Sequence, residues 1–298
     1  MRKRFFSKLA IVMSTALAVS GCFCPIDKAF VNAETIQDED DSYYDDDSDY
    51  DDSYDDSTDD SYDDSTDDSY DDSTDDSDNE ETTGTKIDDI KLSSSELQAF
   101  VKESDSDENG YISQSEAEKI TYVSISKKAS QSDLTQIIKL YPNISELMWN
   151  AGTLTKLTFP KNNIKRLNIT SKAASQLVIS GINQKLNNLF YTAQGSKKYA
   201  FNFAKGSAYK KVEDFNLMGK QINGVKLSNA EVGTLYVTDT SAKKIDASSD
   251  KIINLWVQNN KKLSSFTVRN CSKLKSVSCG YNALSRLNIS GCPKLLSV

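Results

Sequence analysis

The chain contains 298 residues, of which 38% are hydrophobic, and it carries a formal net charge of −9 with no histidine. The absence of histidine excludes the commonest general base, most catalytic triads and most zinc sites. Five cysteines provide neither a disulfide framework nor a paired C-x-x-C zinc motif. No serine, cysteine or carboxylate pair falls at a recognisable catalytic spacing. We therefore expect a protein that is not an enzyme.

Residues 1–33 have the pattern of an export leader. Four basic residues precede an apolar run over residues 9–19, which is too short to span a bilayer as a helix. The segment VSGC at residues 19–22 resembles a bacterial lipobox, in which Cys22 would be lipidated, whereas VNA at residues 31–33 fits an ordinary signal peptidase. We favour Cys22, because the second site lies far beyond the apolar run. Either site predicts an extracellular protein: lipid on Cys22 would hold it at the cell surface, whereas cleavage after Ala33 would secrete it. The lipid on Cys22 is the one membrane contact expected.

Residues 34–90 form an acidic linker built on the repeat DDSYDDST. Residues 34–89 contain 28 acidic residues and one lysine, a net charge of −27. Such a segment has little apolar surface to bury and repels itself, which predicts a disordered, extended spacer. Loose association with calcium or a wall polymer remains an alternative role.

Residues 91–119 predict a small helical cap with one EF-hand calcium loop. The segment LSSSELQAFVKES favours a helix, with Ser93 and Glu96 spaced as a capping box. The segment DSDENGYISQSE, residues 105–116, then fits the pattern D-x-D-x-N-G-x5-E, in which Gly110 permits a sharp turn. The expected Ca²⁺ ligands are Asp105, Asp107, Asn109, the carbonyl of Tyr111, a water at Ser113 and a bidentate Glu116. The sequence contains no second loop to pair with this one, so we expect a weak extracellular site and not a sensor.

Residues 120–298 carry a repeat of apolar residues, mostly at steps of ten or eleven. Three longer steps lie between Leu177 and Phe215. Two steps make about 21 residues, within the range for one coil of a leucine-rich repeat. The repeat predicts a mainly β solenoid of seven coils of short parallel strands, with a strand over residues 120–125 and a helix over residues 133–143 leading into it. The inward residues are Leu147, Leu157, Leu167, Leu177, Leu189, Phe201, Phe215, Val225, Leu235, Ile245, Leu255, Phe266, Val277 and Leu287.

Residues 273–298 come close to the repeat L-x-x-L-x-C-x-x-N-x-L-x-x-L-x-[VI]-S-x-C. Together with the EF-hand loop, strand and helix before the repeats, residues 93–298 resemble bacterial surface leucine-rich repeat proteins of the gut clostridial type. Between residues 134 and 263 the apolar spacing agrees, but the Asn and Cys positions are often missing. The resemblance implies that the EF-hand caps the open end of the solenoid. We interpret Cys271 and Cys292 as stacked buried thiols and Asn260 and Asn282 as turn residues that bond backbone groups.

Outward positions of the repeat form two columns, one on each side. The first reads Met148, Asn168, Phe190, Asn216, Tyr236, Trp256 and Ser278. The second reads Thr158, Val178, Asn202, Lys226, Asp246, Thr267 and Asn288. Only the first column carries large aromatic side chains, so we expect its apolar members to form a ligand face, namely Met148, Phe190, Tyr236 and Trp256. Packing under loops, or a scatter of surface aromatics, is the alternative.

Charge points to anionic partners. Residues 91–298 contain 29 basic and 15 acidic residues, a net charge of +14. Wall teichoic acid, a sulfated glycan or the acidic linker would complement this charge; an ordinary role in solubility is the alternative. Nucleic acid is not expected for an exported protein. The sequence favours a non-enzymatic cell-surface binding protein with a calcium-stabilised cap and a repeat platform for protein or glycan ligands; the alternative is a structural envelope protein without a specific ligand.

Overall fold

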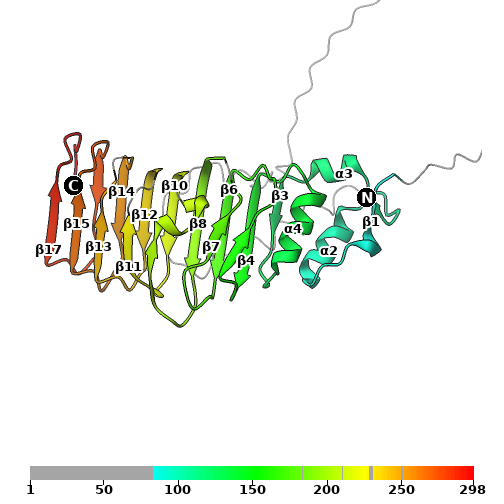
Figure 1. The fold of residues 1–298 in the computed structure, drawn as a ribbon, viewed down its shortest axis with the longest axis horizontal. Helices are drawn as coiled ribbons and strands as arrows, with labels where there is room; N and C mark the ends of the chain where they lie inside the picture. Colours follow the sequence, from blue (N-terminus) through cyan, green and yellow to red (C-terminus); the bar gives the residue numbers. More distant parts are fainter. Residues whose placement is uncertain (1–82, 183, 210, 228–230, 250) are drawn as a thin grey trace, which may run out of the picture. The chain divides into compact units, whose positions relative to one another are not determined.

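A computed structural model describes residues 83–298, except 183, 210, 228–230 and 250. The export leader with Cys22 and the acidic linker up to residue 82 lie outside the described residues. Figure 1 shows two rows of strands, with the helices at one end and β17 at the other. The prediction of a mainly β solenoid of parallel strands is confirmed.

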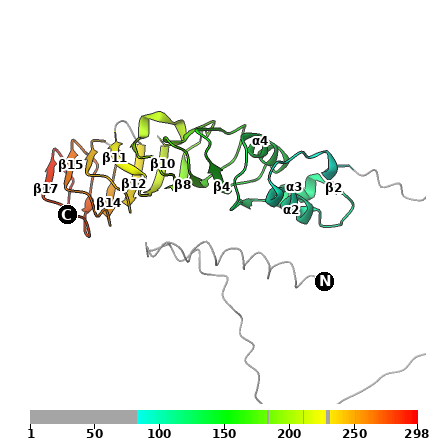
Figure 2. The same cartoon turned by 90° about the horizontal axis from the view of Figure 1, so that it is seen from below.

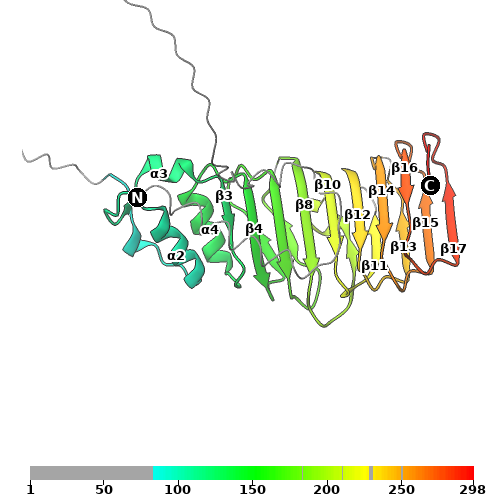
Figure 3. The same cartoon turned by 180° about the vertical axis from the view of Figure 1, so that it is seen from behind.

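One side of the solenoid is a continuous eight-stranded sheet, seen in Figure 3. All neighbouring strands in it are parallel. Because β3 joins this sheet, there are about eight coils where the repeat predicts seven. In spatial order the strands are β3 (Tyr122–Ser124), β4 (Glu146–Gly152), β6 (Arg166–Ser171), β8 (Leu186–Ala193), β10 (Lys211–Met218), β12 (Glu231–Thr238), β14 (Asn254–Gln258) and β16 (Ser276–Ser278).

The opposite side is divided into two shorter parallel sheets, and Figure 2 shows its strands as a separate row. The first pairs β5 (Lys156–Thr158) with β7 (Val178–Ser180). The 3-10 helices η3 (Phe203–Lys205) and η4 (Ser207–Tyr209) follow the first strand of the second sheet. That sheet contains β9 (Tyr199–Asn202), β11 (Ile222–Leu227), β13 (Lys244–Ala247), β15 (Ser265–Arg269) and β17 (Arg286–Ser290).

The inward apolar residues stack in register, and all of them except Leu287 belong to one continuous core; Leu287 is 42% exposed. In the eight-stranded sheet, seven of them lie opposite one another from Leu147 in β4 to Val277 in β16. One predicted phase is wrong, because Leu157 lies opposite Ile179 and not opposite Leu177. Leu177 and Ile179 are two residues apart and both fully buried, so apolar spacing alone could not choose between them.

The longer steps of the repeat accommodate a cluster of buried aromatic rings. Neighbouring rings in it have centroids 4.9 to 6.0 Å apart. The hydroxyl of Tyr209 donates to the carbonyl of Leu177, whose amide donates to the Tyr191 hydroxyl at 3.1 Å. Complete burial raises the pKa of Tyr209 well above its ordinary value. The cluster consists of Tyr191, Phe201, Phe203, Tyr209 and Phe215.

Side-chain amides in the turns connect successive coils, as predicted for Asn260 and Asn282. Asn260 is fully buried; its Oδ1 accepts from the Thr240 amide at 3.0 Å, and its Nδ2 donates to the Val237 carbonyl at 2.9 Å. Its backbone amide donates to Asn282 Oδ1 in the next coil. The described cysteines Cys271, Cys279 and Cys292 are free thiols. Cys271 is buried as predicted, and burial raises its pKa, whereas Cys292 is only partly buried, so the prediction is wrong for Cys292.

A helical end precedes the coils and extends their core. Leu97, Val101, Leu134 and Ile137 are buried in it. Among the described residues, no helix is long and apolar enough to cross a bilayer. The elements are β1 (Thr85–Lys86), η2 (Ile87–Asp89), α2 (Ser95–Ser104), β2 (Tyr111–Ile112), α3 (Gln114–Lys119) and α4 (Gln131–Leu140).

The capping box expected between Ser93 and Glu96 does not form, because α2 is capped one residue later in the chain. Ser94 caps α2 by accepting from the amide of Leu97. Ser93 instead gives its amide and its hydroxyl to the buried carboxylate of Asp133 in α4, each at 2.6 Å. Glu96 accepts from the amides of residues 126 and 127. Both side chains therefore join the first helix to segments that follow it, which local spacing could not reveal.

Candidate functional site

The segment between α2 and α3 folds as a tight acidic loop. Asp105 accepts from the amides of Asn109 and Gly110, at 3.2 and 2.9 Å, and Asn109 Oδ1 accepts from the Tyr111 amide at 2.8 Å. Gly110 has a φ of +85°, a left-handed conformation that glycine adopts without steric cost. These bonds bend the chain so that Asp105, Asp107 and Glu116 offer carboxylate oxygens within 4.8 Å of one another.

Glu116 is the buried carboxylate of this cluster. Its Oε1 accepts from the amide and hydroxyl of Ser106, and its Oε2 accepts from the amide and hydroxyl of Ser113. Ser113 also caps α3, so the pair forms a capping box. Burial alone would raise the pKa of Glu116, but the hydrogen bonds from Ser106 and Ser113 outweigh it and lower the pKa to about 2.

Asp107 shows the opposite effect. The backbone amide of Asn109 acts to lower its pKa, but desolvation and the neighbouring carboxylates of Asp105 and Glu116 outweigh that bond, and the pKa is raised. The loop thus gathers negative charge that a cation would offset. The three carboxylates offer only oxygen donors, which suit a hard cation. Asn109 and Tyr111 lie in the same loop.

A short strand from upstream pairs with the end of this loop. Residues 85 and 86 of β1 lie antiparallel to residues 112 and 111 of β2, and the amide of Ile87 donates to the Gly110 carbonyl at 3.0 Å. This pairing supports the loop where the sequence shows no second loop. The sequence analysis places residues 85–89 in the disordered linker, but they form β1 and η2 and Ile87 packs against the core, so the linker prediction is wrong for these residues.

The outer face of the eight-stranded sheet carries the second candidate site. Register places Met148, Phe190, Tyr236 and Trp256 in one column with Asn216 between two of the aromatic residues. Phe190 and Trp256 are 38% and 37% exposed. The rings of Tyr236 and Trp256 stack with centroids 6.0 Å apart and an interplanar angle of 20°.

Met148 lies apart from the aromatic members of this column. Asn168 separates it from Phe190, and the hydroxyl of Tyr122 on β3 lies 3.1 Å from its sulfur. The structure therefore brings Phe190, Tyr236 and Trp256 together across four strands, with Met148 near the helical end of the same column.

Two polar columns flank the aromatic one on the same face. One runs through Glu146, Arg166, Asn188, Asp214, Thr234, Asn254 and Ser276. The other runs through Asn150, Thr170, Thr192, Met218, Thr238 and Gln258. Several of these side chains bond along the columns, for example Arg166 with Glu146 at 3.4 Å and Ser276 with Asn254 at 2.9 Å. Aromatic rings are thus bordered by amides, hydroxyls and carboxylates.

The second outward column also forms, with one correction. Ser180, and not Val178, lies opposite Thr158, because Leu157 pairs with Ile179 and the register is therefore two residues later than predicted. From Asn202 to Asn288 the register is as predicted. This side carries no aromatic side chain at the same position in the coil.

Comparisons with protein-family models, curated proteins and solved structures find no match to this chain.

Proposed function

We propose that the protein is an exported, non-enzymatic binding protein that holds its ligand on the outer face of the eight-stranded sheet. The observation that carries the proposal is the column Phe190–Asn216–Tyr236–Trp256, in which exposed rings share one register and two of them stack. Aromatic side chains supply much of the energy of binding surfaces. Here the strands hold them in place before a ligand arrives.

A glycan fits this face better than a protein does. The apolar side of a sugar ring stacks on an aromatic ring, and its hydroxyls need partners of the kind that Asn188, Asn254 and Gln258 offer in the flanking columns. A protein partner would favour a larger apolar centre with few charged groups. This face instead places an ion pair, Arg166 with Glu146, beside the column.

We further propose that Ca²⁺ braces the helical end as an EF-hand cap of a leucine-rich repeat protein. Asp105, Asp107, Asn109, the Tyr111 carbonyl and Glu116 would hold the ion, with a water at Ser113. The resemblance of the sequence to bacterial surface proteins supports export, either with a lipid on Cys22 or as a secreted chain. The ion would offset the crowded carboxylates and connect α2 to α3.

The test is a glycan array followed by titration of the best glycan with variants. Trp256→Ala and Tyr236→Ala should each weaken binding at least about tenfold, with changes in stability near 1 kcal/mol, because the rings are partly exposed and stack mainly on each other. Tyr281→Ala is the matched control, since this ring is 80% exposed but lies outside the column.

Three outcomes would contradict parts of this proposal. If Tyr281→Ala weakened glycan binding as much as Trp256→Ala and Tyr236→Ala, the aromatic column would not be the binding site. A hit only on a protein array would replace glycan with protein as the ligand. Binding to neither array would favour a structural envelope protein.

A further inference from the structure

Lysines follow one edge of the solenoid, where the strands of the eight-stranded sheet end. Every turn from the one after β3 to the one after β14 supplies at least one lysine, inside the turn or at the first residue of the next strand. We call this set the basic edge. It consists of Lys127, Lys128, Lys156, Lys172, Lys197, Lys198, Lys220, Lys243, Lys244, Lys261 and Lys262.

Hydrogen bonds hold these turns one above another. The amide of Lys172 donates to the Gly152 carbonyl at 2.6 Å, and the amide of Thr240 donates to Asn260 Oδ1 at 3.0 Å. Seven neighbouring strands spaced about 4.8 Å apart place the first and last turns about 29 Å from each other. The basic edge is therefore a straight row of charge along the stacking direction.

The positive charge of this edge is not neutralised within the described residues. All eleven lysines are exposed, and none of them forms an ion pair with another described residue. Asp239 is the one acidic residue in the sequence of these turns. Like charges held this close repel one another, so the row is a favourable place for a polyanion.

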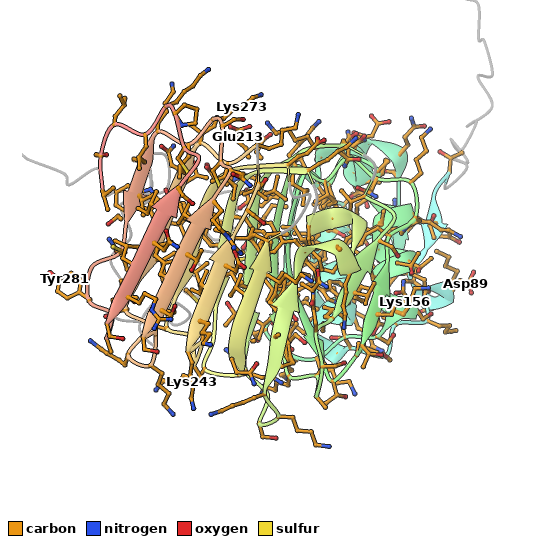
Figure 4. The ribbon with its side chains drawn as sticks, turned by 60° about the vertical axis from the view of Figure 1, so that its left-hand side comes forward. Asp89, Lys156, Glu213, Lys243, Lys273 and Tyr281 are labelled. Atoms are coloured by element: carbon orange, nitrogen blue, oxygen red, sulfur yellow. The ribbon has the colours of Figure 1, made fainter. Side chains whose placement is uncertain are left out.

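The opposite edge also carries lysines, among them Lys161, Lys165, Lys251, Lys273, Lys275 and Lys294, but carboxylates lie beside several of its basic residues. Figure 4 shows Lys243 at one edge and Lys273 and Glu213 at the other. On that other edge Lys185 forms an ion pair with Glu213, and Glu231 lies beside Lys211 on the neighbouring strand. The basic edge therefore differs in having one acidic residue, Asp239, in turns that supply eleven lysines.

We propose that the basic edge binds a linear phosphodiester polymer that lies along the stacking direction. Lysine offers a compact charge on a flexible stem, whereas arginine fixes anions in a bidentate geometry, and the basic edge contains lysine alone. This suits a flexible chain recognised by its charge density. One charge per repeat unit of such a polymer matches the one or two lysines of each turn. The inference does not depend on the ligand of the aromatic face.

The test measures binding of labelled poly(glycerol phosphate) of defined length to the full chain by fluorescence anisotropy, between about 50 and 200 mM salt. Two fourfold variants remove equal charge and are first checked for unchanged melting. The basic-edge variant combines Lys197→Gln, Lys198→Gln, Lys220→Gln and Lys243→Gln. The control combines Lys251→Gln, Lys273→Gln, Lys275→Gln and Lys294→Gln on the opposite edge.

The basic-edge variant should lose at least about tenfold in affinity at 0.1 M salt and show a shallower salt dependence, because fewer counterions are released. The control should lose less than about threefold. Polymers that reach across only two turns should bind more weakly than those that reach across six. Trp256→Ala should leave this binding unchanged, which separates it from the aromatic face.

Equal losses in both fourfold variants would show attraction by net charge alone and overturn the proposal. Absence of binding to poly(glycerol phosphate) would do the same. Tighter binding of heparin or oligothymidine, with the same dependence on the basic edge, would assign the edge to a sulfated glycan or to nucleic acid and overturn the phosphodiester assignment.

Discussion

At the scale of single residues, Asn260 shows how a polar side chain can stabilise the interior of a solenoid. Its side chain is fully buried and bonds Thr240 and the carbonyls of Val237 and Gln258. These bonds cross from one coil to the next. The amide therefore satisfies backbone groups that the turn leaves out of both sheets.

Asn260→Ala should lower the free energy of unfolding by about 2–4 kcal/mol, because it leaves several buried donors and acceptors without partners. Urea unfolding would measure the change. Asn187→Ala, at an exposed position in β8, is the control and should change stability by less than about 0.5 kcal/mol. Similar values for the two variants would mean that water replaces the lost amide.

Asp133 predicts how stability depends on pH. Burial alone would raise its pKa, but hydrogen bonds from Ser93 and Ser130 hold the pKa below its ordinary value of 3.8. A carboxyl with a lowered pKa stabilises the fold when ionised. Its contribution to stability is complete when the pH is above the pKa of the carboxyl in the unfolded chain. The contribution is lost as the pH falls through the pKa of the carboxyl in the folded protein. Glu116 acts in the same direction, from an ordinary value of 4.5 to about 2 in the fold.

Melting temperature should therefore fall as the pH is lowered from about 5 to 2. Asp133→Asn should lower stability at pH 7 and flatten part of this dependence, since one of the titrating groups is gone. Asp88→Asn, at an exposed position, is the control. A pH profile of Asp133→Asn parallel to that of the wild type would show that Asp133 does not contribute.

At the scale of elements, Glu116 serves both the loop and the helix that follows it. It caps α3 through Ser113 and lies within the carboxylate cluster with Asp105 and Asp107. Removing it must therefore weaken the cap even without a metal ion. Only a comparison of stability in calcium with stability in chelator separates the role of Glu116 as a helix cap from its role as a metal ligand.

We expect calcium to raise the melting temperature of the wild type. Glu116→Ala should abolish this rise, and calorimetry should show no calcium binding to this variant. A loss of about 1 kcal/mol should also appear in chelator, from the missing capping box. Glu118→Ala, on the exposed side of α3, should keep the calcium effect. Unchanged calcium binding in Glu116→Ala would refute the proposed ligand set.

Glutamine side chains complete the two short sheets at their first strands. Gln131 bonds both the amide and the carbonyl of Thr158 in β5, at 2.8 and 2.7 Å. Gln176 bonds both backbone groups of Asn202 in β9, at 2.8 and 3.0 Å. Each side-chain amide thus takes the place of a neighbouring strand, which protects an otherwise unpaired edge.

Gln176→Ala should cost about 1–3 kcal/mol, since Gln176 is buried and its removal leaves two backbone groups without partners. Gln131→Ala should cost less, because water can reach that edge. Gln194→Ala, an exposed residue after β8, is the control. Equal effects of all three substitutions on urea unfolding would contradict the role of Gln176.

The element scale also shows what the sequence could and could not predict. The alternation of apolar and polar residues around each repeated apolar position predicted the column that contains Phe190, Tyr236 and Trp256, because parallel strands repeat the same register. Spacing could not distinguish Leu177 from Ile179, since both are buried. It could not predict that Ser93 bonds Asp133 or that β1 pairs with β2, because those contacts join segments far apart in the chain.

At the scale of the whole described part, the two sides of the solenoid are not equivalent. The eight-stranded sheet is unbroken, whereas the opposite side is divided between β7 and β9. An elongated ligand that needs an evenly spaced surface would find it on the unbroken side. The aromatic column lies on that side, and the basic edge follows the turns that end its strands.

The alternation of inward and outward residues also separates two kinds of information within one sequence. Inward positions such as Leu235 and Leu255 are fully buried in the core, whereas Tyr236 and Trp256 beside them lie on the outer face. Selection can therefore change the outward residues of a strand, which are every second residue, without altering the packing of the core. Duplication of one coil would lengthen the surface by a single step of about 4.8 Å and add new side chains to each column. A lineage could in this way alter what such a protein recognises faster than it alters how the protein folds.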